Sequence, residues 1–443
     1  MKKLNKLEES RFLLLFFAFV IGVFLIGAVC MPDRGQMFSG LWQIVSGPSK
    51  ISTNYFAVGG VSATLLNMAL VCAIFLAAFL LLGAKANNVT NLGFLLTLGF
   101  SSWGINVLNI WFPMLGVALY CLVRKEKLSA NANALLYSTG IAPLITELMV
   151  RYLTPETVGF TPAGVLLALV VGLFIGFILP AGLAFSPKVH QGFDLYSAAV
   201  PIGMTAFLLQ GVLYKTMGVA LPAAPDAETL KIAAPVAVNV FCCILFGLCV
   251  VLALAMGTSP KAYWQMIGGK KFVANISATA GNGLFLMNVG VYGLVILAYY
   301  NLVGGTMNAI TFGIIFCMLA CCDSGSNPVT VLPIMLGYWL SSLVFGWFSG
   351  LVGGTFACAV NAQAILVGLC FANGLSTFSG RYGLGYGFAA AVLHYLLVTT
   401  VPNLHGGYCL YNGGFTAAFV CILLLPILER FCKTREERAN ARV

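Results

Sequence analysis

Two short polar stretches lie inside long apolar runs, and their residue types suit the binding of a small solute. Asn327 followed by Pro328 is a favoured start of a helix. A helix start at membrane depth presents free backbone N–H groups, which suit an anion or a carbonyl oxygen. We therefore predict a substrate-binding site here, with an ordinary loop between two membrane spans as the alternative. The residues of this predicted site are Gly104, Asn106, Asn109, Asp323, Ser324, Gly325, Ser326 and Asn327.

Three acidic residues in apolar surroundings, Asp194, Glu147 and Asp323, are candidates for ion or proton coupling. An ionised carboxylate inside a bilayer costs about 3 kcal/mol unless it is solvated or paired. Asp194 follows His190 by four positions, a spacing that puts both side chains on one face of a helix. Two such ligands are too few for a metal site, and no metal or other cofactor is expected. For Glu147, the alternative is that it reaches the outer interface near Arg151.

Asparagine is frequent in the predicted membrane segments. Its amide both donates and accepts hydrogen bonds, so in lipid it must find partners. Packing between helices would supply such partners, and so would a polar path through the protein. Many amides and few charges favour an uncharged or zwitterionic solute over a bare ion. The residues are Asn54, Asn67, Asn91, Asn106, Asn109, Asn288, Asn308, Asn327, Asn361, Asn373 and Asn412.

The composition places the chain in a membrane. Of its 443 residues, 60% are hydrophobic and only 8% are charged, whereas about a quarter of the residues of a soluble protein are charged. The net charge of +10 comes from basic residues in short loops and at the two ends, which excludes a nucleic-acid partner. Most of the 14 cysteines lie in apolar runs. Nucleotide-binding and hydrolase motifs are absent, so ATP-driven transport and enzymatic activity are not expected.

Fourteen apolar segments are candidates for crossing a bilayer, which takes about 20 residues each. Several are short or broken by Gly and Pro and could be re-entrant or interrupted helices. The predicted fold class is therefore an all-α integral membrane protein. We predict a membrane repeat at 1–220, an extracytoplasmic linker at 221–233, a second repeat at 234–431 and a cytoplasmic basic tail at 432–443. The segments are 12–31, 57–83, 88–103, 107–123, 131–150, 162–184, 190–214, 234–256, 278–302, 306–322, 328–350, 353–373, 385–401 and 407–429.

The two halves of the chain match each other in three blocks. Asn327 lies 221 positions after Asn106 (327 − 106), and Gly325 lies 221 after Gly104 (325 − 104). The block 60–67 matches 281–288 at the same offset of 221 (281 − 60), and the block 187–196 matches 402–411 at an offset of 215 (402 − 187). A looser offset of 234 (381 − 147) relates Glu147 to Arg381. Three blocks in the same order indicate a duplication.

The distribution of basic residues predicts that the halves have opposite orientations. With both termini in the cytoplasm and all segments crossing, 18 of the 23 Lys and Arg residues (23 − 5) lie in inside loops, as the positive-inside rule requires. Matched loops differ in charge, since Lys188 corresponds to the neutral Asn403. Seven crossings per half, an odd number, produce this inversion. The five residues in outside loops are Arg34, Lys50, Arg151, Lys215 and Lys231.

Three blocks of the sequence resemble an uncharacterised bacterial and archaeal family. They begin at Asn54-Tyr55-Phe56, at Gly104-Ile105-Asn106 and at His405-Gly406-Gly407. That family is described only as a tandemly repeated membrane domain of unknown function. The resemblance covers most of the chain, implies a duplicated membrane protein and supplies no activity. The patch Tyr411-Asn412-Gly413 is also faintly similar to urea channels, but it is too short to carry residue roles across.

Inverted repeats are typical of secondary transporters, which bind their substrate between the repeats. We therefore expect a cell-membrane secondary transporter for a small polar solute. The alternatives are a passive channel for a small neutral solute, an embedded enzyme that acts on a lipid-linked substrate, and a structural or assembly partner. The expected partners are the solute and the lipid bilayer, and a homo-oligomer is left open.

Overall fold

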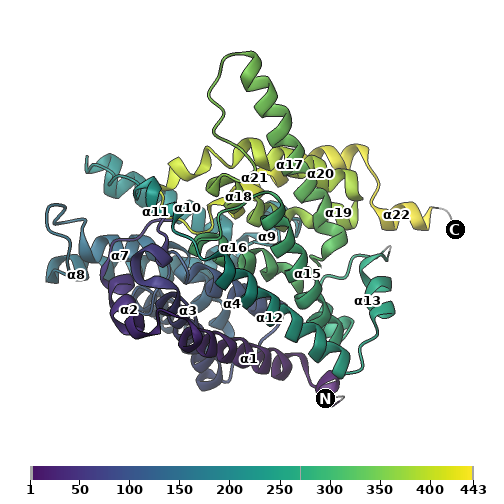
Figure 1. The fold of residues 1–443 in the computed structure, drawn as a ribbon, viewed down its shortest axis with the longest axis horizontal. Coiled ribbons are helices and arrows are strands. Elements are labelled where there is room, and N and C mark those ends of the chain that lie inside the picture. Colours follow the sequence, from purple (N-terminus) through teal and green to yellow (C-terminus); the bar gives the residue numbers. More distant parts are fainter. Residues whose placement is uncertain (1–2, 270, 442–443) are drawn as a thin grey trace.

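The computed structural model describes residues 3–269 and 271–441. All regular structure among these residues is helical (Figure 1). Within the described residues, seven helices are long and apolar enough to cross a membrane: α1, α3, α8 with α9, α12, α15, α17 and α21 with α22. Four further apolar helices, α4, α5, α16 and α20, are shorter. The chain is therefore a multi-pass membrane protein, and the count of fourteen crossings stays a prediction.

The described residues of the first half form ten α-helices, and a short helix, α11 (Ala227–Lys231), lies in the linker. The ten are α1 (Glu9–Cys30), α2 (Met37–Ser46), α3 (Tyr55–Leu82), α4 (Asn88–Phe100), α5 (Trp111–Arg124), α6 (Ala132–Tyr137), α7 (Ala142–Val150), α8 (Pro162–Phe185), α9 (Pro187–His190) and α10 (Ala199–Gln210).

The second half contains the remaining labelled helices. They are α12 (Pro235–Ala255), α13 (Pro260–Ile267), α14 (Ile276–Thr279), α15 (Asn282–Leu302), α16 (Ala309–Leu319), α17 (Pro328–Leu351), α18 (Gln363–Ala372), α19 (Ser376–Arg381), α20 (Leu384–Leu397), α21 (Asn412–Phe431) and α22 (Arg435–Asn440).

The sequence repeat has a counterpart in the backbone. Gly60 has a φ of 86° inside α3, and Gly281, 221 positions later (281 − 60), has a φ of 105° at the start of α15. Such angles are open to glycine at little cost. Asn87 caps α4 and Asn308, again 221 positions later (308 − 87), caps α16. The two halves therefore kink and restart their helices at equivalent positions.

The short helices α4 and α16 pack against each other in the middle of the molecule (Figure 1). Ser102, just after α4, donates to the carbonyl oxygen of Ala309 at the start of α16, at 2.7 Å. At the other end, Asn91 donates to the sulfur of Cys322 at 3.7 Å. Residue numbers therefore rise along one helix while they fall along its partner. Since α4 and α16 are equivalent in the repeat, each half contributes the same element in the opposite direction.

The two central helices cross at glycines. A Cβ atom on Gly99 would meet the carbonyl oxygen of Gly313, and a Cβ atom on Gly313 would meet that of Gly99. Close by, the thiol of Cys317 contacts the carbonyl oxygen of Leu96 at 3.8 Å. Cys317 and Leu96 are themselves 221 positions apart (317 − 96). The equivalent helices thus touch at equivalent residues.

Each half also contains a second interrupted segment. In the first half, the turn Ser138–Ile141 separates α6 from α7, and in the second half, the turn Asn373–Leu375 separates α18 from α19. The predicted segment 131–150 is therefore a broken helix. Both breaks are buried among the described residues, so their free carbonyl groups need partners from elsewhere in the protein.

Those partners come from the opposite half. Leu195 donates its backbone N–H to the oxygen of Gly374 at 3.1 Å, and Leu410 donates to the oxygen of Gly140 at 3.0 Å. Leu410 corresponds to Leu195 (410 − 195 = 215), and Gly374 to Gly140 (374 − 140 = 234). The halves therefore exchange loops 191–198 and 406–411 in a reciprocal manner.

The prediction that His190 and Asp194 share a helical face is wrong. Helix α9 ends at His190, because Gln191 and Gly192 have φ values of 51° and 76°. Asp194 then lies in the exchanged loop, where its backbone cannot continue the helix. The i, i+4 spacing in this sequence therefore reflects a turn.

The glycine crossing gives a test of the packing between α4 and α16. We expect Gly313→Ala to lower the unfolding free energy by about 1–3 kcal/mol, because the new methyl group meets the Gly99 carbonyl and the Ser102 hydroxyl. Thermal unfolding of the purified protein in detergent measures this loss. The control is Gly247→Ala in α12, whose Cβ would have no atom within 4 Å. Equal melting temperatures for the two variants would contradict the crossing.

Candidate solute-binding site

The short helices α4 and α16, which we call half-helices, end inside the protein. Asparagine side chains donate hydrogen bonds to backbone carbonyl groups just after these helix ends, which the helices themselves leave unpaired. Asn67 donates to the oxygens of Ser101 at 2.7 Å and Ile105 at 2.8 Å. Asn288 donates to the equivalent oxygens of Cys322 at 2.8 Å and Ser326 at 2.9 Å. Both asparagines are fully buried. Equivalent asparagine side chains therefore bind the backbone oxygens at equivalent helix ends in the two halves.

The predicted site residues of the first half form one compact cluster just after α4. The side-chain oxygen of Asn106 accepts from the backbone N–H groups of Leu108 and Asn109, both at 3.0 Å. Asn109 donates to the oxygen of Gly104 at 2.9 Å and to the hydroxyl of Thr146 at 2.9 Å. These amides are buried, and most of their hydrogen bonds are made within the protein.

The predicted site residues of the second half surround the start of α17. Asn327 caps this helix, with Pro328 at its first position, as predicted. Its side-chain oxygen accepts from the backbone N–H groups of Val329 at 3.0 Å and Thr330 at 3.2 Å. The helix start at Asn327-Pro328 is therefore confirmed, and its N–H groups are occupied by the cap.

The remaining polar residues of this second cluster bond to neighbouring segments. Ser326 shares a hydrogen bond of 2.8 Å with Ser376, and Ser324 accepts from Asn88 at 3.4 Å. Asp323 accepts from the backbone N–H and the hydroxyl of Ser277, both at 2.8 Å. The carboxylate thus ties the end of α16 to α14.

The two predicted clusters do not meet. Because α4 and α16 run antiparallel, Asn106 lies at one end of the helix pair and Asn327 at the other. The residues predicted as one binding site are therefore two separate clusters.

The first pocket, which we call the Lys50 pocket, has a volume of about 430 Å³. Lys50 and Arg151 are its charged lining residues, and Ser49, Thr53 and Asn54 line it with polar groups. Ser49 contacts the carbonyl oxygen of Trp103 at 3.5 Å, which places this pocket beyond the C-terminal end of α4. Its volume is typical of sites for small ligands.

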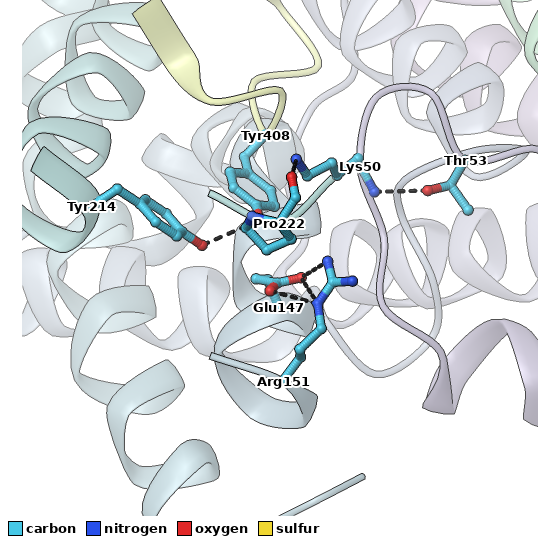
Figure 2. A network of polar contacts seen from close by, with 7 residues as sticks. All are labelled: Lys50, Thr53, Glu147, Arg151, Tyr214, Pro222 and Tyr408. Atoms are coloured by element: carbon cyan, nitrogen blue, oxygen red, sulfur yellow. Dashed lines mark hydrogen bonds and ion pairs between the residues drawn. The ribbon is translucent and has the colours of Figure 1, made fainter. Parts of the chain in front are cut away.

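Lys50 joins three parts of the chain at this pocket (Figure 2). Its ammonium donates to the oxygen of Pro222 in the linker at 2.6 Å and lies 5.3 Å from the ring centre of Tyr408, which belongs to the second half. Burial lowers the pKa of Lys50, the nearby Glu147 carboxylate raises this pKa in part, and Arg151 lowers it further. Lys50 is thus a largely buried cation at the junction of both halves.

Glu147 lies behind the pocket and is fully buried. Arg151 donates to its two carboxylate oxygens at 2.6 to 3.1 Å, as Figure 2 shows. This is the strong bidentate form of an Arg–carboxylate pair. Glu147 is therefore paired with Arg151 rather than with Arg381, and Arg151 keeps part of its side chain exposed to the pocket.

The second pocket, which we call the Arg381 pocket, has a volume of about 660 Å³. Its lining includes Ala274, which accepts a hydrogen bond from Asn88 at the start of α4. The Arg381 pocket therefore lies at the opposite end of α4 from the Lys50 pocket. Arg381 itself stacks its guanidinium over Phe193 at 4.8 Å and over Phe272 at 5.8 Å.

The two pockets are equivalent in the repeat. Lys271, which lines the Arg381 pocket, is the counterpart of Lys50 (271 − 50 = 221). Phe193, under Arg381, is the counterpart of Tyr408, under Lys50 (408 − 193 = 215). Each pocket thus combines a lysine and an arginine of one half with an aromatic ring of the other.

Aromatic side chains fill the space between the exchanged loops. Tyr196 packs against Phe371 with ring centres 5.1 Å apart, and Tyr411 packs against Phe100 at 5.0 Å. Phe100 and Phe371 stack at 6.1 Å. All four rings are buried. They form what we call the aromatic seam, which is closed in this structure.

Asp194 lies at the edge of this seam. One carboxylate oxygen accepts from the backbone N–H of Tyr196 at 2.9 Å. The other oxygen is buried and has no hydrogen-bond partner among the described residues. The side chain packs against Gly374, in the break between α18 and α19. Its counterpart in the second half is the uncharged Cys409 (409 − 194 = 215).

The site residues predicted from the sequence do not include Lys50, Lys271, Phe193 and Tyr408. In the sequence, Lys50 and Lys271 are charges of predicted loops, although their separation of 221 (271 − 50) equals the repeat offset. That shared offset is the one feature of the sequence that could have identified the two lysines as equivalent site residues. The stacking of each aromatic ring under a cation of the other half could not be read from the sequence.

These features define a multi-pass membrane protein built from two copies of one helical unit, with an equivalent pocket at each end of the central helix pair. The chain belongs to the family described as protein of unknown function DUF1576. The model of that family matches residues 33–215 and again residues 266–430. No curated protein and no solved structure matches the chain.

The pair of Glu147 and Arg151 gives a test of the Lys50 pocket. We expect Arg151→Gln to lower the unfolding free energy by about 3–5 kcal/mol, because it leaves a buried carboxylate without a partner. The double variant Glu147→Gln with Arg151→Gln removes both charges and should recover most of the loss. Thermal unfolding in detergent compares the three proteins. A single variant as stable as the wild type would contradict the pairing.

Proposed function

We propose that the protein is a secondary transporter that moves a small polar solute across the cell membrane by alternating access. The observation that carries this proposal is the pair of equivalent pockets at opposite ends of α4 and α16. A transporter of this kind opens its site to one side at a time, by rocking one repeat against the other. Two equivalent pockets with a closed seam between them suit such a cycle.

The inverted orientation of the two halves is part of the proposal. It is supported by the antiparallel course of the equivalent helices α4 and α16 and by the basic residues of the predicted inside loops. With both termini in the cytoplasm, the linker at 221–233 and the Lys50 pocket face outward, and the Arg381 pocket faces inward. The two family matches fall within the repeats proposed at 1–220 and 234–431.

The buried aromatic seam favours a transporter over a passive channel. A channel needs a continuous path, whereas Tyr196, Tyr411, Phe100 and Phe371 are almost completely inaccessible. The alternative of an embedded enzyme would need His190, Asp194 and Glu147 to converge on one substrate. Glu147 lies behind the Lys50 pocket, while His190 ends α9 and Asp194 lies in the exchanged loop beside the Arg381 pocket, so this alternative has less support.

Asp194 is the coupling residue that we favour. An ionised carboxylate is destabilised when one of its oxygens is buried without a hydrogen-bond partner. Binding of a proton or a cation would therefore stabilise Asp194. Asp194 also contacts Gly374, and its loop donates the bond from Leu195 to that same residue. A change in the charge of Asp194 would therefore act on the contact between the two halves. Asp323 and Glu147 already have strong partners.

Reconstituted transport tests the proposal. We expect proteoliposomes to accumulate at least one solute from a panel of small labelled metabolites when a pH or ion gradient is imposed. Asp194→Asn should abolish gradient-driven accumulation while it leaves downhill exchange, because the variant keeps the loop but not the titratable group. Cys409→Ser, at the equivalent position, is the matched control and should transport like the wild type. No movement of any solute under any gradient would overturn the proposal.

The orientation can be tested separately by labelling in intact cells. In a protein whose exposed Cys30 and Cys243 are replaced by serine, we expect a membrane-impermeant maleimide to label Ala224→Cys in the linker. Ala439→Cys in α22 should react only after the cells are permeabilised. Both positions are exposed. Labelling of the two positions from the same side would contradict the proposed topology.

A further inference from the structure

The Lys50 pocket presents spare hydrogen-bond donors on cations, and its neutral polar side chains are already engaged. Asn54 donates to the backbone oxygens of Thr229 and Ile232 at 2.7 and 2.8 Å, and its side-chain oxygen accepts from Ala309 and Phe56 at 3.0 and 3.2 Å. A neutral solute would therefore find few free partners on this amide.

The three hydroxyl groups of the pocket make hydrogen bonds as well, and that of Thr229 donates to the oxygen of Asp226 at 2.5 Å. Thr53 accepts from the backbone N–H of Lys50 at 2.8 Å, and Ser49 donates to Trp103 at 3.5 Å. The ammonium of Lys50, by contrast, has three donors and makes one hydrogen bond among the described residues, to Pro222. What the pocket offers to a solute is thus mainly the N–H groups of a cation.

No acidic side chain lines the Lys50 pocket in the described part of the chain. Glu147 is fully buried behind it and is bound on both oxygens by Arg151. The charges of Lys50, Arg151 and Glu147 alone add up to +1 (2 − 1). A solute that enters the pocket therefore meets two cations, one of which has no acidic partner.

The Arg381 pocket repeats the lysine and the arginine but not the absence of acidic lining residues. Arg381 forms no hydrogen bond or ion pair within residues 3–269 and 271–441, although its guanidinium is held in place by two aromatic rings. Acidic residues also line this pocket, but they come from the end of α21 and from the tail. Of these, Glu437 binds the backbone N–H and the hydroxyl of Thr434, at 2.6 and 2.9 Å, rather than Arg381.

We infer that the solute is a small oxyanion, bound through its carboxylate or phosphate oxygens by Lys50 and Arg151 in one pocket and by Lys271 and Arg381 in the other. This inference rests on the proposed function for the passage between the two pockets, but binding can be measured without transport. Charge-assisted hydrogen bonds from ammonium and guanidinium groups are the strong interactions that such oxygens make. The cluster of amides near Asn106, which makes most of its hydrogen bonds within the protein, then has a structural role.

Ligand-dependent thermal unfolding of the full-length protein, in a detergent with a neutral headgroup, tests this inference. The probes are acetate, succinate and inorganic phosphate, with acetamide and succinamide as uncharged isosteres. We expect at least one oxyanion to raise the melting temperature and both amides to have no effect. Lys50→Gln should weaken the apparent affinity by about tenfold or more, because a charged hydrogen bond is lost.

Three variants control this measurement. Lys50→Arg keeps the charge and should retain the response, and Lys215→Gln removes an exposed lysine outside the pocket and should behave like the wild type. If Lys50→Gln does not fold, Lys271→Gln carries the same test for the second pocket. Its response should fall in the same way.

Several results would overturn the inference. Equal stabilisation by oxyanions and amides would contradict it, and so would no response to any oxyanion or a response that is unchanged in Lys50→Gln and Lys271→Gln. Stabilisation by added phosphatidylglycerol but by no free anion would assign the site to a lipid headgroup. Oxyanion binding without uptake into proteoliposomes would refute the proposed transport and leave the binding site intact.

Discussion

The structure depends on one constraint, which is that backbone carbonyl groups at the ends of helices inside a membrane protein must find partners within the protein. Helices α4 and α16 are shorter than the seven long apolar helices of the described residues, and their C-terminal ends are buried. Asn67 and Asn288 satisfy these groups with the same pair of hydrogen bonds in each half. The ends of α4 and α16 in turn determine the positions of Asn106, which lies in the turns before α5, and of Asn327, which caps α17.

The same constraint explains the exchange between the halves. The broken segments α6–α7 and α18–α19 leave free carbonyls at Gly140 and Gly374, and each is bound by a loop of the other half. The interface between the halves therefore consists of the same contact made twice. In such an interface, one copy of the contact can break while the other stays intact. Alternating access requires this asymmetry, because the protein opens to one side of the membrane at a time. Asp194, which is present in only one of the two loops, makes the copies unequal in charge.

A large part of the fold could be predicted from the sequence, because it follows from local signals. The apolar runs locate the membrane helices, the offset of 221 relates the halves, and the pair Asn327-Pro328 marks a helix start that the structure confirms. The prediction that His190 and Asp194 lie on one helical face is wrong, because the positive φ angles of Gln191 and Gly192 end the helix between them.

The candidate site was harder to predict, since it depends on contacts between distant segments. The bond from Leu195 to Gly374 joins residues 179 positions apart (374 − 195) and has no sequence signal of its own. The stacking of Arg381 on Phe193 and of Lys50 on Tyr408 likewise crosses from one half to the other. Only the repeat offset between Lys50 and Lys271 pointed to these pockets, and it identified neither the aromatic rings nor the saturation of the neighbouring amides.

The central claim is that the two pockets open in alternation around the helix pair α4 and α16. Distances between pairs of spin labels in lipid nanodiscs test this most directly, with one pair at Gly47 and Asn403 on the side of the Lys50 pocket and the other at Lys188 and Ala274 on the side of the Arg381 pocket. The account predicts that a change of pH or the addition of a transported solute lengthens one distance while it shortens the other. Distances that lengthen together, or that do not change under any condition, would contradict it.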